Sequence, residues 1–204
     1  AGTSWRAAQF RPGHDPIPAL AAALGADNLL FPPAKEGRLP VAQMVEDTLR
    51  MSRLGLIETI EMARLEPHVN VLIVADQFEE LFRYRGAIHG TAPGRRAGLE
   101  EATAFVNLLL ETAKHPESNI YIVLTMRSDF LGDCDNFFGL PEALNRSQYL
   151  VPRLTREQLR QAVEGPLQLF GASMSPALLE RILTDVGDQS DQLPVLQHAL
   201  MRTW

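Results

Sequence analysis

Two short runs of β-branched and aliphatic residues constrain the fold of this chain most strongly. Val69–Ala75 reads VNVLIVA, and Asn119–Thr125 reads NIYIVLT. Nearly continuous apolar runs of this length are typical of strands that are buried on both faces of a parallel sheet. Between them, Leu99–Lys114 has the apolar spacing of an amphipathic helix. Strands that alternate with helices of this length predict an α/β fold with a parallel sheet.

Weaker patterns extend this prediction along the chain. Ser4–Phe10 is a candidate strand, and Gln148–Val151 is a further one. Arg85–Gly98 contains four glycines and is expected to be an exposed loop. From Thr155 onward every segment has helical spacing. We therefore expect a partial α/β core over residues 1–154 and an all-helical subdomain over residues 155–204, with both ends of the sequence lying inside a longer protein.

Composition excludes several classes of function. The formal net charge of −6 argues against nucleic acid as the default partner, because phosphate binding usually needs a basic surface. Cys134 is the single cysteine, which excludes an internal disulfide and fits a reducing cytoplasm. No apolar run approaches the ~20 residues of a membrane helix. A cytoplasmic protein is the expectation.

Acidic residues follow the first of the two apolar strands. Asp76 stands at its carboxyl end, which is where open α/β sheets bind ligands, and an Asp there can hold Mg²⁺ opposite nucleotide phosphates. Glu79 and Glu80 follow within one helical turn, and one of them could polarise an attacking water. Helical geometry separates them by ~100°, so that only one can point at the site. In the alternative interpretation Asp76 caps the following helix, and Glu79 completes a reciprocal cap.

An arginine follows the second apolar strand. Arg127 would lie within reach of Asp76 if the two strands are neighbours, and its guanidinium could contact the terminal phosphate of a nucleotide. The alternative is an ion pair with Asp76 or Asp129 that closes the edge of the sheet.

Taken in order, the motifs resemble those of the novel STAND NTPase domain, a P-loop ATPase type that precedes WD-type repeats in many bacterial signalling proteins. The resemblance covers nearly the whole chain, and it is carried by the following segments: Trp5 with Phe10-Arg11-Pro12-Gly13 and Pro16, Asp76-Gln77-Phe78-Glu79-Glu80-Leu81-Phe82, Thr125-x-Arg127-Ser128-Asp129-Phe130, Tyr149-Leu150-Val151, Leu154-x-x-Glu157-x-Leu159, Glu164-Gly165-Pro166, and Leu193-Pro194-x-Leu196-Gln197-His198-Ala199-Leu200.

This resemblance implies an AAA-like parallel sheet, an all-helical lid over residues 155–204, and ATP or GTP with Mg²⁺ as a switch between a closed monomer and an open oligomer. It implies that Asp76 is the Walker B magnesium residue and that Glu79, or else Glu80, is the catalytic carboxylate. Arg127 corresponds to the first sensor, and Pro194 to the lid proline that packs on the base. The implied partners are an upstream effector, downstream sensor or repeat domains, and further copies of the chain.

The phosphate-binding loop of this family is missing from the sequence. A P-loop needs Gly-x-x-x-x-Gly-Lys-Ser/Thr, because its amides and its lysine hold the phosphates. Lys35 and Lys114 are the only lysines, and neither follows such a loop. In the family's order the loop and its strand come directly before residue 1 in the sequence. In the sheet, that strand would lie between the strand ending at Thr125 and the one near Leu150.

Without that strand two apolar edges of the sheet would be exposed, which favours the explanation that it lies upstream in a longer protein. A fragment whose edge is covered by a partner, and a degenerate relative that binds no nucleotide, are the alternatives. We expect a signalling switch, or alternatively an inactive scaffold domain. Residues 1–204 alone are not expected to hydrolyse ATP well.

Overall fold

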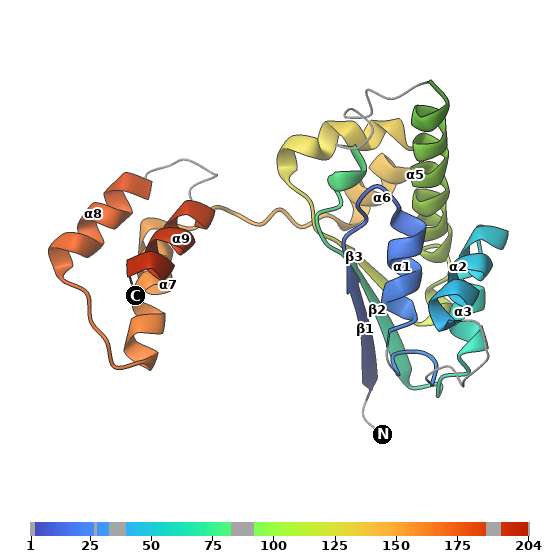
Figure 1. Cartoon of the computed structure of the whole chain (residues 1–204), viewed down its shortest axis with the longest axis horizontal. Helices are drawn as coiled ribbons and strands as arrows, with labels where there is room; N and C mark the ends of the chain where they lie inside the picture. The colour runs from blue at the N-terminus through green and yellow to red at the C-terminus, as the bar shows by residue number, and fades with distance from the viewer. Residues whose placement is uncertain (1–2, 27, 33–39, 83–91, 187–192, 204) are drawn as a thin grey trace. The chain divides into compact units, whose positions relative to one another are not determined.

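The computed structural model of the protein describes residues 3–26, 28–32, 40–82, 92–186 and 193–203. The chain divides into two compact units, Ala1–Gln148 and Tyr149–Trp204 (Figure 1). Each unit has its own cluster of buried apolar side chains.

A parallel sheet of three strands forms the centre of the first unit. The strands are β1 (Ser4–Phe10), β2 (Val69–Ala75) and β3 (Ile120–Leu124), in the order β1-β2-β3. The middle strand is the most apolar one, as expected for the position that has a neighbour on both sides. The predicted α/β fold with a parallel sheet is thus confirmed.

Helices connect the strands. In this unit they are α1 (Pro16–Leu24), α2 (Val41–Met51), α3 (Gly55–Met62), α5 (Ala92–Thr112) and α6 (Leu140–Ser147), with 3-10 segments η1 (Pro116–Ser118) and η2 (Ser128–Asn136). Helices α1 to α3 link β1 to β2, and α5 links β2 to β3. Figure 1 shows all four on one side of the sheet.

The two faces of the sheet differ in burial. On the face toward the helices, Val71 and Ile73 are fully buried and pack in the core with Phe105 of α5. The opposite face presents Trp5 and Tyr121, whose rings lie 5.0 Å apart, and each is about half exposed (52% and 48%). Among the described residues of this unit, therefore, only one face of the parallel sheet is covered.

Two predicted segments differ from the structure. Gln148–Val151 is not a strand, because no described strand lies beside it to share a ladder of hydrogen bonds, and Tyr149, Leu150 and Val151 are all exposed. The loop predicted over Arg85–Gly98 is helical from Ala92, while residues 83–91 lie outside the described residues. Pro93 is the second residue of α5, where the missing amide hydrogen breaks no helical bond.

Three helices form the second unit. They are α7 (Arg156–Leu169), α8 (Pro176–Val186) and α9 (Leu193–Thr203). Thr155 and Gln158 start α7 with a reciprocal capping box. Leu159 of α7 and Leu183 of α8 contribute to the small core, and Glu180 of α8 pairs with two arginines of α7 at the surface.

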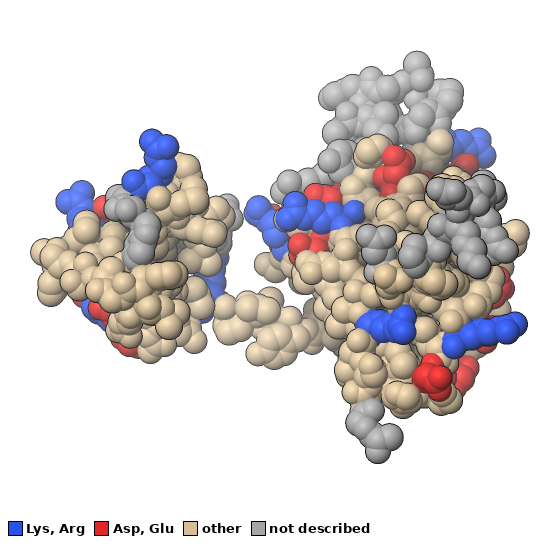
Figure 2. Space-filling model, turned by 60° about the horizontal axis from the view of Figure 1, so that its bottom comes forward, with Lys and Arg blue, Asp and Glu red and all other residues tan. Residues whose placement is uncertain are grey.

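No described helix is long and apolar enough to cross a membrane. On the face shown in Figure 2, basic side chains stand singly or in small groups beside acidic ones, and no broad basic surface appears among the described residues.

Candidate functional site

The carboxyl ends of the three strands bring the polar residues of the sequence motifs to one edge of the sheet. In the parallel register Ala75 lies opposite Phe10 of β1 and Leu124 of β3. The next residues of the three segments, Arg11, Asp76 and Thr125, therefore emerge side by side. The ladder continues one step into this edge: the Asp76 amide donates to the Phe10 carbonyl at 2.8 Å, and the Thr125 amide donates to the Ala75 carbonyl at 3.0 Å.

Asp76 is held at this edge with its carboxylate partly exposed (29% of the side chain). Its Oδ1 accepts a hydrogen bond of 2.5 Å from the Thr125 hydroxyl, and its Oδ2 lies 3.8 Å from Nε of Arg11. The chain then turns at Gln77, which has a left-handed φ of 56°.

The alternative in which Asp76 caps the next helix does not fit this geometry. A cap at Asp76 would accept from the amide of Phe78 or Glu79. The Phe78 amide instead donates to the Thr125 carbonyl at 2.8 Å, and the helix begins only at Glu80. The Asp76 carboxylate instead accepts from the Thr125 hydroxyl and lies beside Arg11 at the sheet edge.

Glu79 and Glu80 have different surroundings. Glu80 Oε2 accepts a hydrogen bond of 3.1 Å from the Gly13 amide, and Glu80 Oε1 accepts one of 3.2 Å from Gln77 when the amide of Gln77 is oriented to satisfy its neighbours. Glu79 is 6% exposed, and among the described residues its Oε2 has no hydrogen-bond partner. Glu80 therefore fastens the loop after β1, whereas Glu79 keeps an unsatisfied buried oxygen.

Arg127 pairs with Asp129 rather than with Asp76 in the structure. Its Nε and Nη2 donate to the two carboxylate oxygens of Asp129 at 3.1 and 3.0 Å. Both side chains are about half exposed. Of the two ion pairs considered from the sequence, the one with Asp129 is thus the one observed.

A shallow, open pocket of about 470 Å³ lies next to this edge of the sheet, and Asp76 is not among its described lining residues. It is lined by Gln77, Glu79, Thr125, Met126 and Arg127. Beside the orphaned oxygen of Glu79, the nearby carboxylate of Asp76 and the hydroxyl of Thr125 offer oxygen atoms only. Oxygen donors are what Mg²⁺ prefers, and protein sites often supply it with one carboxylate while water and substrate phosphates complete the shell. The donor set therefore fits Mg²⁺.

The structure does not bring every predicted residue to this pocket. Pro194 is the second residue of α9 and is exposed within the helical unit. Lys114 follows α5, near the amino end of β3, and pairs with Glu111 at 2.8 Å. Lys35 lies outside the described residues.

Three residues at the site were assigned no role from the sequence. They are Arg11 and Gly13, which follow β1, and Thr125, which follows β3. The rule that singled out Asp76 and Arg127, position just past the carboxyl end of a parallel strand, applies to them as well. Extending it to β1 would have found Arg11 and Gly13, and ending the second apolar strand at Leu124 would have found Thr125.

The lone cysteine is not part of this site. Burial, with a smaller contribution from the charge of Asp133, raises the pKa of the Cys134 thiol to about 11. A thiol that stays protonated at neutral pH is a poor nucleophile. Cys134 packs with Phe137 in the core of the first unit, as expected for a structural residue.

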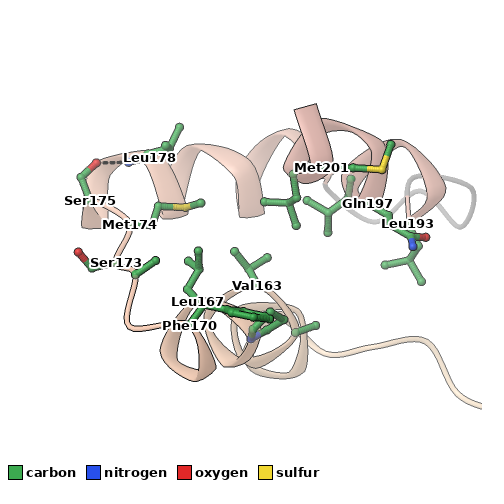
Figure 3. A pocket seen from close by; sticks show the side chains of 15 residues that line it. Val163, Leu167, Phe170, Ser173, Met174, Ser175, Leu178, Leu193, Gln197 and Met201 are labelled. Atoms are coloured by element: carbon green, nitrogen blue, oxygen red, sulfur yellow. Dashed lines mark hydrogen bonds between the residues drawn. The ribbon is translucent and has the colours of Figure 1, made fainter. Parts of the chain in front are cut away.

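A larger cavity, of about 870 Å³, lies within the helical unit. Figure 3 shows Val163 and Leu167 of α7, and Phe170 directly after it, beneath Met174, Leu178 and Met201, the last from α9. The described residues of its lining include no titratable side chain. It is therefore an apolar groove without acid–base or metal chemistry.

Comparison with known proteins identifies a family for the whole chain. The family model described as Novel STAND NTPase 1 matches residues 1–204. Searches of curated proteins and of solved structures give no significant match.

Proposed function

The chain belongs to the Novel STAND NTPase 1 family, and we propose that it carries part of the nucleotide site of a signalling switch that takes ATP or GTP with Mg²⁺. The observation that carries this proposal is the pair of carboxylates at the sheet edge. Asp76 is partly exposed and fixed by one oxygen, and Glu79 is buried with one oxygen unpartnered beside an open pocket. Buried polar atoms nearly always have hydrogen-bond partners, so a carboxylate with a purely structural role at the surface would not be expected to bury an unpartnered oxygen.

Asp76 is the proposed residue that holds Mg²⁺, directly or through water. When bound, the cation would neutralise charge on the nucleotide phosphates. The Asp76 carboxylate supplies the negative charge at the carboxyl end of β2, and Thr125 keeps it oriented toward the edge of the sheet.

Glu79 is the proposed general base. A base must accept a proton from water in the pocket, so it needs an oxygen that no protein group occupies. Among the described residues no group donates to Glu79 Oε2, which is buried and would have to turn toward the pocket to meet the water, whereas Glu80 accepts from the Gly13 amide and, with the Gln77 amide reoriented, from Gln77 as well. The helical phase left the two residues equivalent, and their hydrogen bonds favour Glu79.

Arg127 is the proposed contact to the terminal phosphate. It lines the same pocket as Glu79, and its ion pair with Asp129 is half exposed. Such pairs contribute only about 0–1 kcal/mol, so a phosphate can replace Asp129 as the partner at small cost. A guanidinium binds phosphate in the same bidentate manner as a carboxylate.

The phosphate-binding loop of the proposed site is not among residues 1–204, and the sheet indicates where it would attach. The connections β1–β2 and β2–β3 run in one direction along the sheet, with their helices on one face. Parallel crossovers are right-handed, so an upstream strand that pairs with β3 and then leads back to β1 would place its helix on the opposite face. That face carries the half-exposed Trp5 and Tyr121.

We therefore propose that an upstream strand and helix, with the phosphate loop between them, pair with β3 and cover Trp5, Tyr121 and Val123. Burying three large side chains that are each about half exposed gives this packing a hydrophobic driving force.

The switch itself is proposed from family membership. The helical unit would act as a lid with Pro194 against the base, and nucleotide exchange would control assembly of a larger protein with effector and repeat domains. The competing possibility is an interaction scaffold that keeps the fold without binding nucleotide.

Phosphate release by the full-length protein with Mg–ATP tests the proposal. We expect Glu79→Gln to lower the turnover rate by about 100-fold or more, the usual contribution of a general base, while Mg–ATP binding persists. Glu80→Gln is the matched control and should stay within a few-fold of the wild type, since the described hydrogen bonds of Glu80 go to Gly13 and Gln77. Equal losses in both variants, or none in either, would contradict the assignment, and a wild-type protein without Mg–ATP binding would favour the scaffold.

A further inference from the structure

We propose that Thr125 is a positioning residue for the cation site: its hydroxyl fixes Asp76 so that Oδ2 alone faces the metal. This inference rests on the proposed function of Asp76, and it assigns a role to a residue beyond the carboxylates and Arg127. It is carried by the hydrogen bonds that join Thr125 to the segment from Ala75 to Phe78.

The Thr125 hydroxyl both accepts and donates a hydrogen bond. Its oxygen accepts a hydrogen bond of 3.1 Å from the Gln77 amide, and its single proton is donated to Asp76 Oδ1 at 2.5 Å. A hydroxyl has one proton to give. Because Gln77 can only donate to it, that proton remains directed at the carboxylate.

The backbone of Thr125 fixes the position of this hydroxyl. Its amide donates to the Ala75 carbonyl at 3.0 Å, and its carbonyl accepts from the Phe78 amide at 2.8 Å. Together with the two bonds of the side chain, four hydrogen bonds join one residue after β3 to the turn after β2. A β-branched side chain adds little rotational freedom of its own.

This arrangement gives the two oxygens of Asp76 different roles. Oδ1 is committed to Thr125, and Oδ2 forms an ion pair with Arg11, whose Nε lies 3.8 Å away, too far for a hydrogen bond. Mg²⁺ demands near-ideal octahedral geometry from its ligands. A carboxylate that cannot rotate presents one oxygen in a fixed direction, which matches that demand.

A purely structural Thr125 would also stabilise the strand ends, so loss of stability alone does not test the proposal. The distinguishing readout is the Mg²⁺ concentration that gives half of the maximal enhancement of ATP binding. Partners of a metal ligand typically affect metal affinity by 10- to 100-fold.

The test uses the full-length protein, with ATP affinity measured by calorimetry over a series of Mg²⁺ concentrations. Thr125→Val keeps the shape and removes the hydroxyl, and we expect it to raise the half-saturating Mg²⁺ concentration about 10-fold or more. Thr125→Ser restores the hydroxyl and should return the value to within about 2- to 3-fold of the wild type. Affinity for ATP without Mg²⁺ should change in neither variant.

Thr112→Val is the matched control. Thr112 matches Thr125 in residue type and in using its hydroxyl as a donor, but Thr112 is buried (1% exposed) while Thr125 is exposed, and the Thr112 hydroxyl donates to the Leu108 carbonyl within α5. This variant should lower the melting temperature and leave the Mg²⁺ dependence unchanged.

Asp76→Asn distinguishes failure of the positioning role of Thr125 from failure of the proposed function of Asp76. If Asp76→Asn abolishes the Mg²⁺ dependence while Thr125→Val leaves it at the wild-type value, the positioning role is overturned and the proposed function stands. A Thr125→Ser variant as impaired as Thr125→Val likewise overturns the role of the hydroxyl. If Asp76→Asn itself leaves the Mg²⁺ dependence unchanged, the proposed function is overturned, and the role of Thr125 with it.

Discussion

At the scale of single residues, the candidate site depends on which of two adjacent glutamates is left without a partner. Sequence spacing places Glu79 and Glu80 at nearly the same distance from Asp76 and cannot separate them. The separation comes from the turn at Gln77 and from the Gly13 amide, 67 residues away in the sequence, which occupies Glu80. Such a long-range contact has no local signal.

The unpartnered oxygen of Glu79 predicts a gain of stability on its removal. A buried polar atom without a partner costs about 1–3 kcal/mol, so Glu79→Met should raise the free energy of unfolding by about 1 kcal/mol. Glu80→Met should lower it, because the Gly13 amide loses its acceptor. Urea denaturation of both variants measures this. A Glu79→Met variant less stable than Glu80→Met would indicate that Glu79 has a structural partner.

The sequence nevertheless predicted which polar residues lie at the carboxyl ends of the two apolar strands. The apolar runs before Asp76 and Arg127 predicted two strands, and parallel strands present their carboxyl ends at one edge. Neither the capping alternative for Asp76 nor the choice of Asp129 as partner of Arg127 could be decided that way. Both depend on hydrogen bonds made by Thr125 and on side-chain rotamers, which spacing does not determine.

At the scale of elements, the sequence predicted helices correctly, because their hydrogen bonds lie within one segment. It failed for a strand whose hydrogen bonds require a second strand beside it. The helices α7 to α9 follow from the helical spacing that the sequence shows from Thr155 onward. Tyr149–Val151 has strong strand-forming residues, yet a strand forms only with a partner, and none of the described strands lies beside it. Helix α5 begins earlier than predicted because glycines at positions 94 and 98 weaken a helix without preventing it.

The approach of α2 to α3 gives a prediction at the same scale. A Cβ atom on Gly55 would lie 2.5 Å from the Thr48 carbonyl oxygen and 2.9 Å from the Cα of Leu49, both backbone atoms. Gly55→Ala should therefore force the two helices apart and cost about 1–3 kcal/mol of stability. Gly132→Ala is the control, because nothing lies within 4 Å of its added methyl group. Thermal denaturation should show a lower midpoint for the first variant only, and equal midpoints would rule out the close contact.

At the scale of the whole molecule, the proposed upstream segment accounts for both the open face of the sheet and the incomplete phosphate site. Parallel sheets are normally covered on both faces, and here Trp5, Tyr121 and Val123 are half exposed on one of them. The residues at the strand ends supply the carboxylates of a magnesium site, but no loop among residues 1–204 has the pattern that holds phosphates. One upstream strand–loop–helix segment would meet both needs.

The central claim is that Asp76 holds the Mg²⁺ of a bound nucleotide. Calorimetric titration of ATP into the full-length protein, with and without Mg²⁺, tests it in the wild type and in Asp76→Asn, a change that keeps the size of the side chain and removes its charge. We predict that Mg²⁺ tightens ATP binding to the wild type by at least about 10-fold, in line with the loss expected for a metal ligand and its partners, and that Asp76→Asn loses this enhancement. An Asp76→Asn variant that binds Mg–ATP as tightly as the wild type would contradict the claim.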